Sequence, residues 1–165
     1  MKTELLAFAL GCALWVGAVG PTGAQTTESA ASVSPANPKF EPERAKRLGA
    51  DPIGMRSYVM VILKTGPNKM PAGKERDEMF AGHFANIKRL SDDGKLLVAG
   101  PADGVDGWRG IFILAVKEVE EARLLTATDP VIGKGEMVAD YHKLYMSAAL
   151  MEIPALHPKV AEKVL

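Results

Sequence analysis

Residues 79–101, MFAGHFANIKRLSDDGKLLVAGP, are the most informative stretch for the fold, because their pattern predicts a helix, its end and the strand that follows. The apolar residues of the first part recur at helical spacing and predict one stripe on a helix from Lys74 to about Asp93: Phe80, Phe84, Ile87 and Leu90. Gly94 is typical of a helix C-cap, and the apolar run that ends at Pro101 predicts a short strand. His83 falls within the stripe, so we expect it to face a sheet rather than solvent.

Two segments on either side of this stretch are apolar on both faces. RSYVMVILKTG (56–66) and RGIFILAV (109–116) are rich in aromatic and β-branched residues and predict buried strands. KEVEEARLLTAT (117–128) predicts a second helix that the following Asp-Pro pair stops, and GEMVADYHKLYM (135–146) predicts a final strand. The order β-α-β-β-α-β predicts an α+β fold of the ferredoxin-like, split βαβ type, with a four-stranded antiparallel sheet and two helices on one face.

This arrangement leaves the second face of the sheet without helices. The strands that begin at Ser57 and Gly110 are apolar on both sides, so a single copy would expose a large apolar patch, which usually marks an interface. Two such sheets packed face to face about a two-fold axis would cover both patches. We therefore expect a homodimer with a dimeric α+β barrel between its sheets.

The N-terminal segment differs in kind from the rest of the chain. MKTELLAFALGCALWVGAVGPTGA (1–24) has an early lysine, a long apolar run and small residues at its end, a pattern typical of a secretory signal peptide. We expect cleavage near Ala24, which would leave a secreted or periplasmic protein with no membrane attachment. An uncleaved membrane anchor is the alternative, although the apolar run is short and glycine-rich for a membrane span.

The remaining boundaries follow from local composition. Residues 25–54 begin with a small, polar, proline-containing stretch that predicts a flexible linker, and a proline and a glycine then bracket a short helix over 41–48. We expect this helix to pack on the domain as an N-terminal extension. The domain itself is expected over residues 55–150, and residues 151–165 are expected to form a loose C-terminal tail.

Charge and cysteine content exclude several classes of function. The 165 residues include 20 Lys and Arg and 20 Asp and Glu, so there is no basic field to attract nucleic acid. The sequence has no Cys-x-x-Cys or His-x-x-x-His spacing, and we expect no metal and no bound cofactor. Cys12 is the single cysteine and lies in the expected signal peptide, so we expect no disulfide in the mature chain.

Three stretches, taken in order, resemble the YciI-like (YCII-related) family: GHFANIKRLSDDGKLLVAGPADG (82–104), GIFILAVKEVEEA (110–122) and TDPVIGKGEMVADYH (128–142). The resemblance implies a dimeric α+β barrel and a histidine–aspartate pair, which falls on His83 and Asp129 in this chain. It also implies small-molecule chemistry, since some relatives act on small, ring-derived or chlorinated compounds. Other proteins with this barrel are monooxygenases, isomerases or haem-handling proteins, so the fold alone does not select a reaction. The signal peptide indicates an exported branch of the family.

His83 and Asp129 each allow two interpretations. The histidine is either a neutral core residue bonded to a backbone carbonyl or a general acid/base in a pocket. The aspartate is either a turn residue that ends a helix or a carboxylate that reaches the imidazole. No serine or cysteine nucleophile accompanies them, so the functional interpretation is proton transfer or water activation on a small organic molecule. A non-catalytic periplasmic ligand-binding or stress-associated barrel is the alternative.

Other residues are weaker candidates for a site. The glycine- and aspartate-rich stretch GPADGVDGWRG (100–110) favours a hairpin turn over a calcium loop, because it lacks the ligand count and the terminal glutamate of such a loop. Trp108 and Arg109 could line a pocket mouth that suits an anionic or aromatic ligand. Tyr58 and His142 are further candidate pocket residues.

Overall fold

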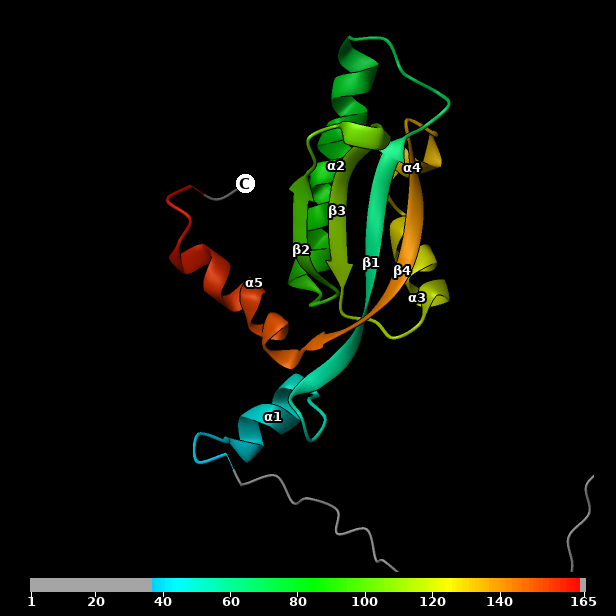
Figure 1. Cartoon of the computed structure of the whole chain (residues 1–165). Helices are drawn as coiled ribbons and strands as arrows, with labels where there is room; N and C mark the ends of the chain where they lie inside the picture. Colours follow the sequence, from blue (N-terminus) through cyan, green and yellow to red (C-terminus); the bar gives the residue numbers. More distant parts are fainter. Residues whose placement is uncertain (1–36, 164–165) are drawn as a thin grey trace, which may run out of the picture. The chain divides into compact units, whose positions relative to one another are not determined.

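The computed structural model describes residues 37–163, so the signal peptide expected at 1–24 and the first part of the linker lie outside the described residues (Figure 1). The helices and strands are, in chain order, α1 (Pro42–Leu48), β1 (Met55–Thr65), α2 (Lys74–Asp92), β2 (Leu96–Pro101), β3 (Trp108–Leu114), α3 (Val119–Thr126), α4 (Pro130–Gly133), β4 (Met137–Ser147) and α5 (Ile153–Leu156). Three short 3₁₀ turns complete the order, η1 (Val105–Gly107), η2 (Ala148–Glu152) and η3 (His157–Lys159).

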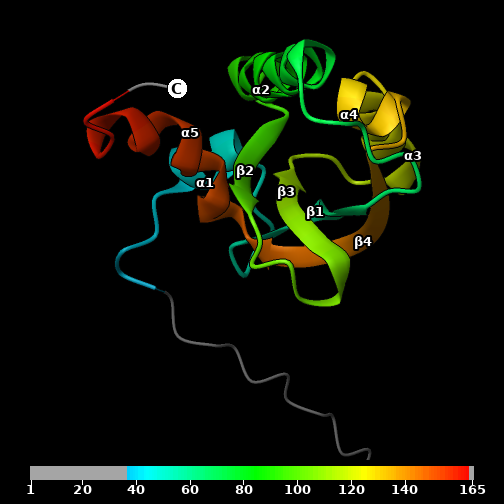
Figure 2. The same cartoon turned by 90° about the horizontal axis from the view of Figure 1, so that it is seen from above.

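The four strands form one antiparallel sheet in the order β2-β3-β1-β4. Helices α2, α3 and α4 lie together on one face of this sheet (Figure 2). The chain is therefore α+β with the ferredoxin-like, split βαβ topology, as the sequence predicts. The two crossover connections, α2 and α3–α4, lie on the same face of the sheet. The end of α3 and the start of α4 therefore come beside α2.

The buried face of α2 differs from the stripe that the apolar residues predict. Its buried residues follow the helical repeat and are Met79, His83, Asn86 and Leu90. Phe84, which the prediction places inward, is 60% exposed. It follows His83 by one position, which turns its side chain about 100° around the helix axis, away from the buried face. The row that faces the sheet thus carries two polar side chains, and the phenylalanine lies at its edge.

The main core fills the space between the sheet and these helices. Its strand residues alternate along β1, with Val59, Val61 and Leu63 all buried. Residues of the other elements pack against them: Met79, Leu90, Leu96, Phe112, Leu114, Val116, Ala122, Val131 and Met137. This core fixes α2 against β3, which places His83 near the ring of Phe112.

The second face of the sheet holds a smaller apolar cluster of Tyr58, Leu97 and Ile113. The expectation of a loose tail over 151–165 is wrong for residues up to 159, because η2, α5 and η3 form successive helical turns. Leu150 and Met151 pack against the small cluster. Contact of these two half-buried side chains with Tyr58 and its neighbours holds η2 against the second face of the sheet.

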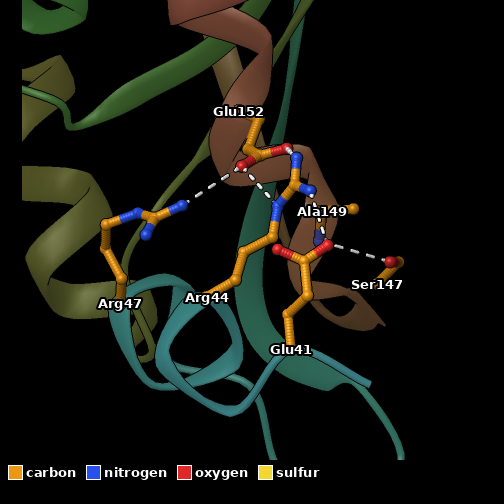
Figure 3. Close-up of polar contacts among 6 residues, drawn as sticks. All are labelled: Glu41, Arg44, Arg47, Ser147, Ala149 and Glu152. Atoms are coloured by element: carbon orange, nitrogen blue, oxygen red, sulfur yellow. Dashed lines mark hydrogen bonds and ion pairs between the residues drawn. The ribbon is translucent and has the colours of Figure 1, made fainter. Parts of the chain in front are cut away.

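Helix α1 is joined to η2 by an ion-pair cluster at the end of the long β1–β4 pair (Figures 1 and 3). Arg44 donates to both carboxylate oxygens of Glu152, over 2.9 Å from Nε and 2.5 Å from Nη2, and Arg47 lies 3.6 Å from the same carboxylate. In Figure 3 Glu41 approaches Arg44 from the start of α1. The helix expected at 41–48 therefore contacts the segment that follows β4.

Candidate active site

His83 and Asp129 meet in a direct hydrogen bond between α2 and the start of α4. The imidazole Nδ1 lies 2.7 Å from Asp129 Oδ2. The histidine is 7% exposed and the aspartate is fully buried. The structure thus brings together the two residues that the sequence names as candidate site residues, which lie 46 positions apart in the chain.

Local backbone structure places the Asp129 carboxylate. Asp129 is the N-cap of α4, with an extended backbone (φ −84°, ψ 121°), and its Oδ1 accepts a hydrogen bond of 3.1 Å from the backbone N–H of Val131. Pro130 follows at the first helical position, where a missing N–H costs nothing. One carboxylate oxygen therefore caps the helix, and the other is free to face the imidazole.

A glycine allows α2 and α4 to approach closely enough for this bond. A Cβ built on Gly82 would lie 2.9 Å from Pro130 Cγ, closer than carbon atoms pack without displacement. Gly82 and Pro130 are the chain neighbours of His83 and Asp129. The contact between them sets the spacing of the two elements at the hydrogen bond itself.

Three phenylalanine rings surround the imidazole. Phe112 of β3 stacks with it at a centroid distance of 6.1 Å and an interplanar angle of 24°, and Phe80 meets it edge-on at 6.1 Å. Phe84 lies at 5.5 Å in a tilted orientation. Phe112 is buried and Phe84 is largely exposed, so the pair lies between a fixed apolar wall and a ring at the surface.

The chemistry of the pair follows from which atoms can donate. A carboxylate only accepts hydrogen bonds, so Nδ1 must carry the proton of the 2.7 Å bond. The other ring nitrogen, Nε2, then has a lone pair in the neutral imidazole. Within residues 37–163 this nitrogen makes no hydrogen bond, so the arrangement provides a base whose tautomer is fixed.

Asn86 adds a buried polar side chain that sequence reasoning missed. Its Oδ1 accepts hydrogen bonds from Arg89 Nη2 at 2.8 Å and from Thr128 Oγ1 at 2.9 Å, and Arg89 Nη2 also lies 3.0 Å from Thr128 Oγ1. Thr128 immediately precedes Asp129, so this network ties the turn of the carboxylate to α2. The spacing of Met79, His83, Asn86 and Leu90 is the signal that could have revealed it.

Glu136 is a second buried carboxylate that receives a hydrogen bond from α2. Arg76 Nη2 donates to its Oε1 over 3.2 Å, and the backbone N–H of Met70 donates to its Oε2 over 2.6 Å. The hydrogen bond from Met70, aided by the positive charges of Arg76 and Arg109, lowers the pKa of Glu136 although burial opposes it. Arg76 also stacks over Phe80 at 4.5 Å, so this pair and His83 contact the same ring.

The weaker candidates lie apart from the histidine–aspartate pair. Tyr58 is buried on the second face of the sheet, where its hydroxyl donates to the carbonyl of Ser147 over 2.9 Å. His142 lies exposed on the same face, opposite Met60 in the strand register. Trp108 and Arg109 are half-buried at the start of β3. The positive charge of Arg109 helps to lower the pKa of Glu136, which lies near α2.

The β2–β3 connection forms a turn, with Asp103 Oδ1 accepting from the backbone N–H of Val105 at 3.1 Å. Across residues 37–163, no group of three or more His, Cys, Asp and Glu side chains is placed to hold a metal ion. The same residues contain no helix with the length and apolar character to cross a bilayer.

Comparison with models of protein families identifies the domain. The family model described as a YCII-related domain matches residues 57–142, a range that begins in β1, ends in β4 and includes both His83 and Asp129. No curated protein matches the chain.

Proposed function

The chain belongs to the YCII-related domain family, and from this membership and the geometry of the site we propose that it is a small-molecule enzyme. His83 acts as the general acid/base, and Asp129 holds its imidazole in position. Nε2 takes a proton from an acidic C–H group or from water, and returns it later in the reaction.

The observation that carries the proposal is the 2.7 Å bond from Nδ1 to a fully buried carboxylate. A core histidine needs only a backbone carbonyl, which adds no charge to the interior. A buried carboxylate is costly to desolvate and is retained where its charge stabilises a protonated partner. The side chains that hydrogen-bond to His83 in residues 37–163 include no serine or cysteine, which favours proton transfer over a covalent intermediate.

The test is turnover of a panel of small organic compounds by the full chain and by three variants. General acid/base groups contribute about 10² to 10⁴ in rate, so His83→Asn should lower kcat by at least about 100-fold. Asp129→Asn should lower kcat while it keeps the cap on α4. His157→Asn is the matched control, because His157 is exposed in the C-terminal turns, away from both His83 and the second face of β1 and β4. Equal activity in all variants would leave the non-catalytic ligand-binding barrel as the function.

The family resemblance also supports a homodimer as the active form. By strand register, half-buried Met60 and exposed Val138 lie on the second face of the sheet, which the C-terminal turns cover only in part. Sedimentation equilibrium should give two copies per particle, and Val138→Lys should shift the equilibrium toward single copies. Leu124→Lys, at a still more exposed apolar position on α3 on the helix side of the sheet, should not. A single copy at all concentrations contradicts this part of the proposal.

The N-terminal sequence supports action outside the cytoplasm, in the periplasm or after secretion. The apolar run and the small residues before position 25 are the basis for this location. N-terminal sequencing of the chain recovered from a secreting host should begin at Gln25. A chain that retains Met1 and stays with the membrane fraction contradicts it.

A further inference from the structure

Asn86 lies one helical turn after His83 on the buried face of α2, and only half of its carboxamide is used. The side chain is 7% exposed, and Oδ1 accepts the two hydrogen bonds from Arg89 and Thr128. Nδ2 is buried and has no hydrogen-bond partner among residues 37–163. A buried amide donor without an acceptor costs free energy comparable to a lost hydrogen bond, so its position beside the acid/base residue requires an explanation.

The network fixes which way the carboxamide points. An arginine side chain has five donors and no acceptor, so the atom that faces Arg89 Nη2 at 2.8 Å must be the oxygen. The amide cannot exchange its oxygen and nitrogen without setting donor against donor at this contact. Nδ2 therefore faces away from Arg89 and Thr128 and stays available to an acceptor.

Arg89 also makes this amide a stronger donor. A guanidinium bound to Oδ1 withdraws electron density from the carboxamide, and hydrogen bonds in such a chain strengthen one another. The amide is held by two hydrogen bonds before any ligand arrives. A rigid, polarised donor next to a base is the arrangement that stabilises negative charge developing on an oxygen.

Phe84 marks the side from which a ligand can reach the imidazole. Of the three rings around the imidazole, Phe112 is buried in the core, whereas Phe84 is 60% exposed and lies 5.5 Å from the imidazole. Exposed side chains change rotamer on the picosecond to nanosecond timescale. Rotation of Phe84 would open the site to a small molecule without movement of the backbone.

We propose that Asn86 Nδ2 is a substrate-binding donor, and that the substrate is a small carbonyl compound with an acidic proton on the adjacent carbon. This inference rests on the proposed acid/base function of His83. The C–H bond breaks, its proton moves to His83 Nε2, and the electron pair passes to the carbonyl oxygen as an enolate. Asn86 hydrogen-bonds that oxygen, and return of the proton to carbon completes the exchange.

The first experiment observes the donor directly by NMR. The chain has four carboxamide side chains, those of Asn37, Asn68, Asn86 and Gln25, so each side-chain amide signal can be assigned. Cyclopentanone added to the ¹⁵N-labelled full chain should move the Asn86 signal downfield, while cyclopentane should not. Asn68, whose amide already donates to the carbonyl of Lys134, is the internal control. An Asn86 signal that cyclopentanone leaves unmoved overturns the proposal.

The second experiment measures exchange of the α-protons of cyclopentanone for deuterium in D₂O. Asn86→Asp keeps an oxygen for Arg89 and Thr128 but removes the donor, and it should slow exchange at least about tenfold, since a single such donor is worth about 10² or more. Asn86→Leu, a neutral second variant, should do the same. Exchange unchanged in both variants overturns the role of Asn86 and leaves that of His83 intact. A shifted Asn86 signal without exchange in the unmodified chain supports the donor and contradicts the acid/base function.

Discussion

Asp129 and Glu136 are both buried carboxylates that follow α3, and each receives a hydrogen bond from a side chain of α2. Each also accepts a hydrogen bond from a backbone N–H, Asp129 from that of Val131 and Glu136 from that of Met70. The two sites differ in the α2 partner. Arg76 is permanently charged and has no lone pair, whereas His83 has a second nitrogen that can accept a proton.

The two carboxylates therefore differ in what they hold: Glu136 holds a loop and an arginine, and Asp129 holds an imidazole. Glu136 uses both oxygens to hold the loop at Met70 and the start of α2, so its pair stabilises the fold. Asp129 uses one oxygen for the helix cap and the other to orient an imidazole whose Nε2 has no partner in residues 37–163. Removal of Glu136 should therefore affect stability most, and removal of Asp129 should affect the state of the histidine most.

The largest expected effect on stability is that of Glu136→Ala. It leaves the Met70 N–H and the Arg76 guanidinium without their carboxylate, and should lower the free energy of unfolding by about 2 to 3 kcal/mol. Urea unfolding measures the change. Glu120→Ala, an exposed position on α3, is the control and should change stability by about 0.5 kcal/mol or less. A loss below about 1 kcal/mol for Glu136→Ala would remove the contrast between the two carboxylates.

The second prediction concerns pH and the same residue. Because the Met70 hydrogen bond lowers the folded-state pKa of Glu136 below its ordinary value of 4.5, its stabilisation is present above that value and is lost as pH falls through the lowered folded-state pKa. The stability difference between the unmodified chain and Glu136→Gln should be constant near neutrality and narrow below about pH 4.5. A difference that persists unchanged to pH 3 would show that the carboxylate charge is not involved.

Asp129→Asn should lower the free energy of unfolding by about 1 kcal/mol, less than Glu136→Ala does, because asparagine is an equally good N-cap. Asp129→Ala removes the cap as well and should cost about 1 kcal/mol more. The asparagine amide would place a donor against Nδ1 and drive the proton to Nε2, which ¹⁵N NMR of the imidazole detects. Asp140→Asn, on the exposed surface, should leave the imidazole signals unchanged, and an unchanged tautomer in Asp129→Asn would contradict the account.

The smallest expected effect on stability is that of Gly82→Ala. The free energy gained from the higher helix propensity of alanine offsets part of the cost of the close contact between the new Cβ and Pro130. We expect a net loss of about 0.5 kcal/mol. The added Cβ should nevertheless push α4 from α2, lengthen the bond of 2.7 Å and move the Nδ1 proton signal upfield. Gly133→Ala, where a Cβ meets nothing within 4 Å, is the control. Identical proton signals in the two variants would count against the spacing role of Gly82.

Sequence reasoning predicts the topology and the inward position of His83, because hydrophobic periodicity is a local property. The pairing of Asp129 with it is implied by the family resemblance, and the split βαβ order, which places both crossovers on one face, allows the contact. The family match supports the same order. These features depend on pattern and topology rather than on particular side-chain partners.

The burial of Asn86 and Glu136 could not be predicted in the same way. Each is buried because partners distant in the chain satisfy it, Thr128 in one case and Met70 in the other. The exposure of Phe84 depends on a rotation of one position around the helix, and the position of η2 depends on the apolar cluster that Leu150 and Met151 contact. Polar partners and such small rotations are properties of the packed structure.

The most direct test of the central claim is the protonation state of His83 in the unmodified chain, measured by ¹⁵N–¹H NMR above the pH at which the imidazole becomes neutral. Exposed His142 and His157 provide internal references. We expect a single tautomer for His83, with the proton on Nδ1 and a lone pair on Nε2. A proton on Nε2, or a mixture of tautomers like that of the exposed histidines, would contradict it.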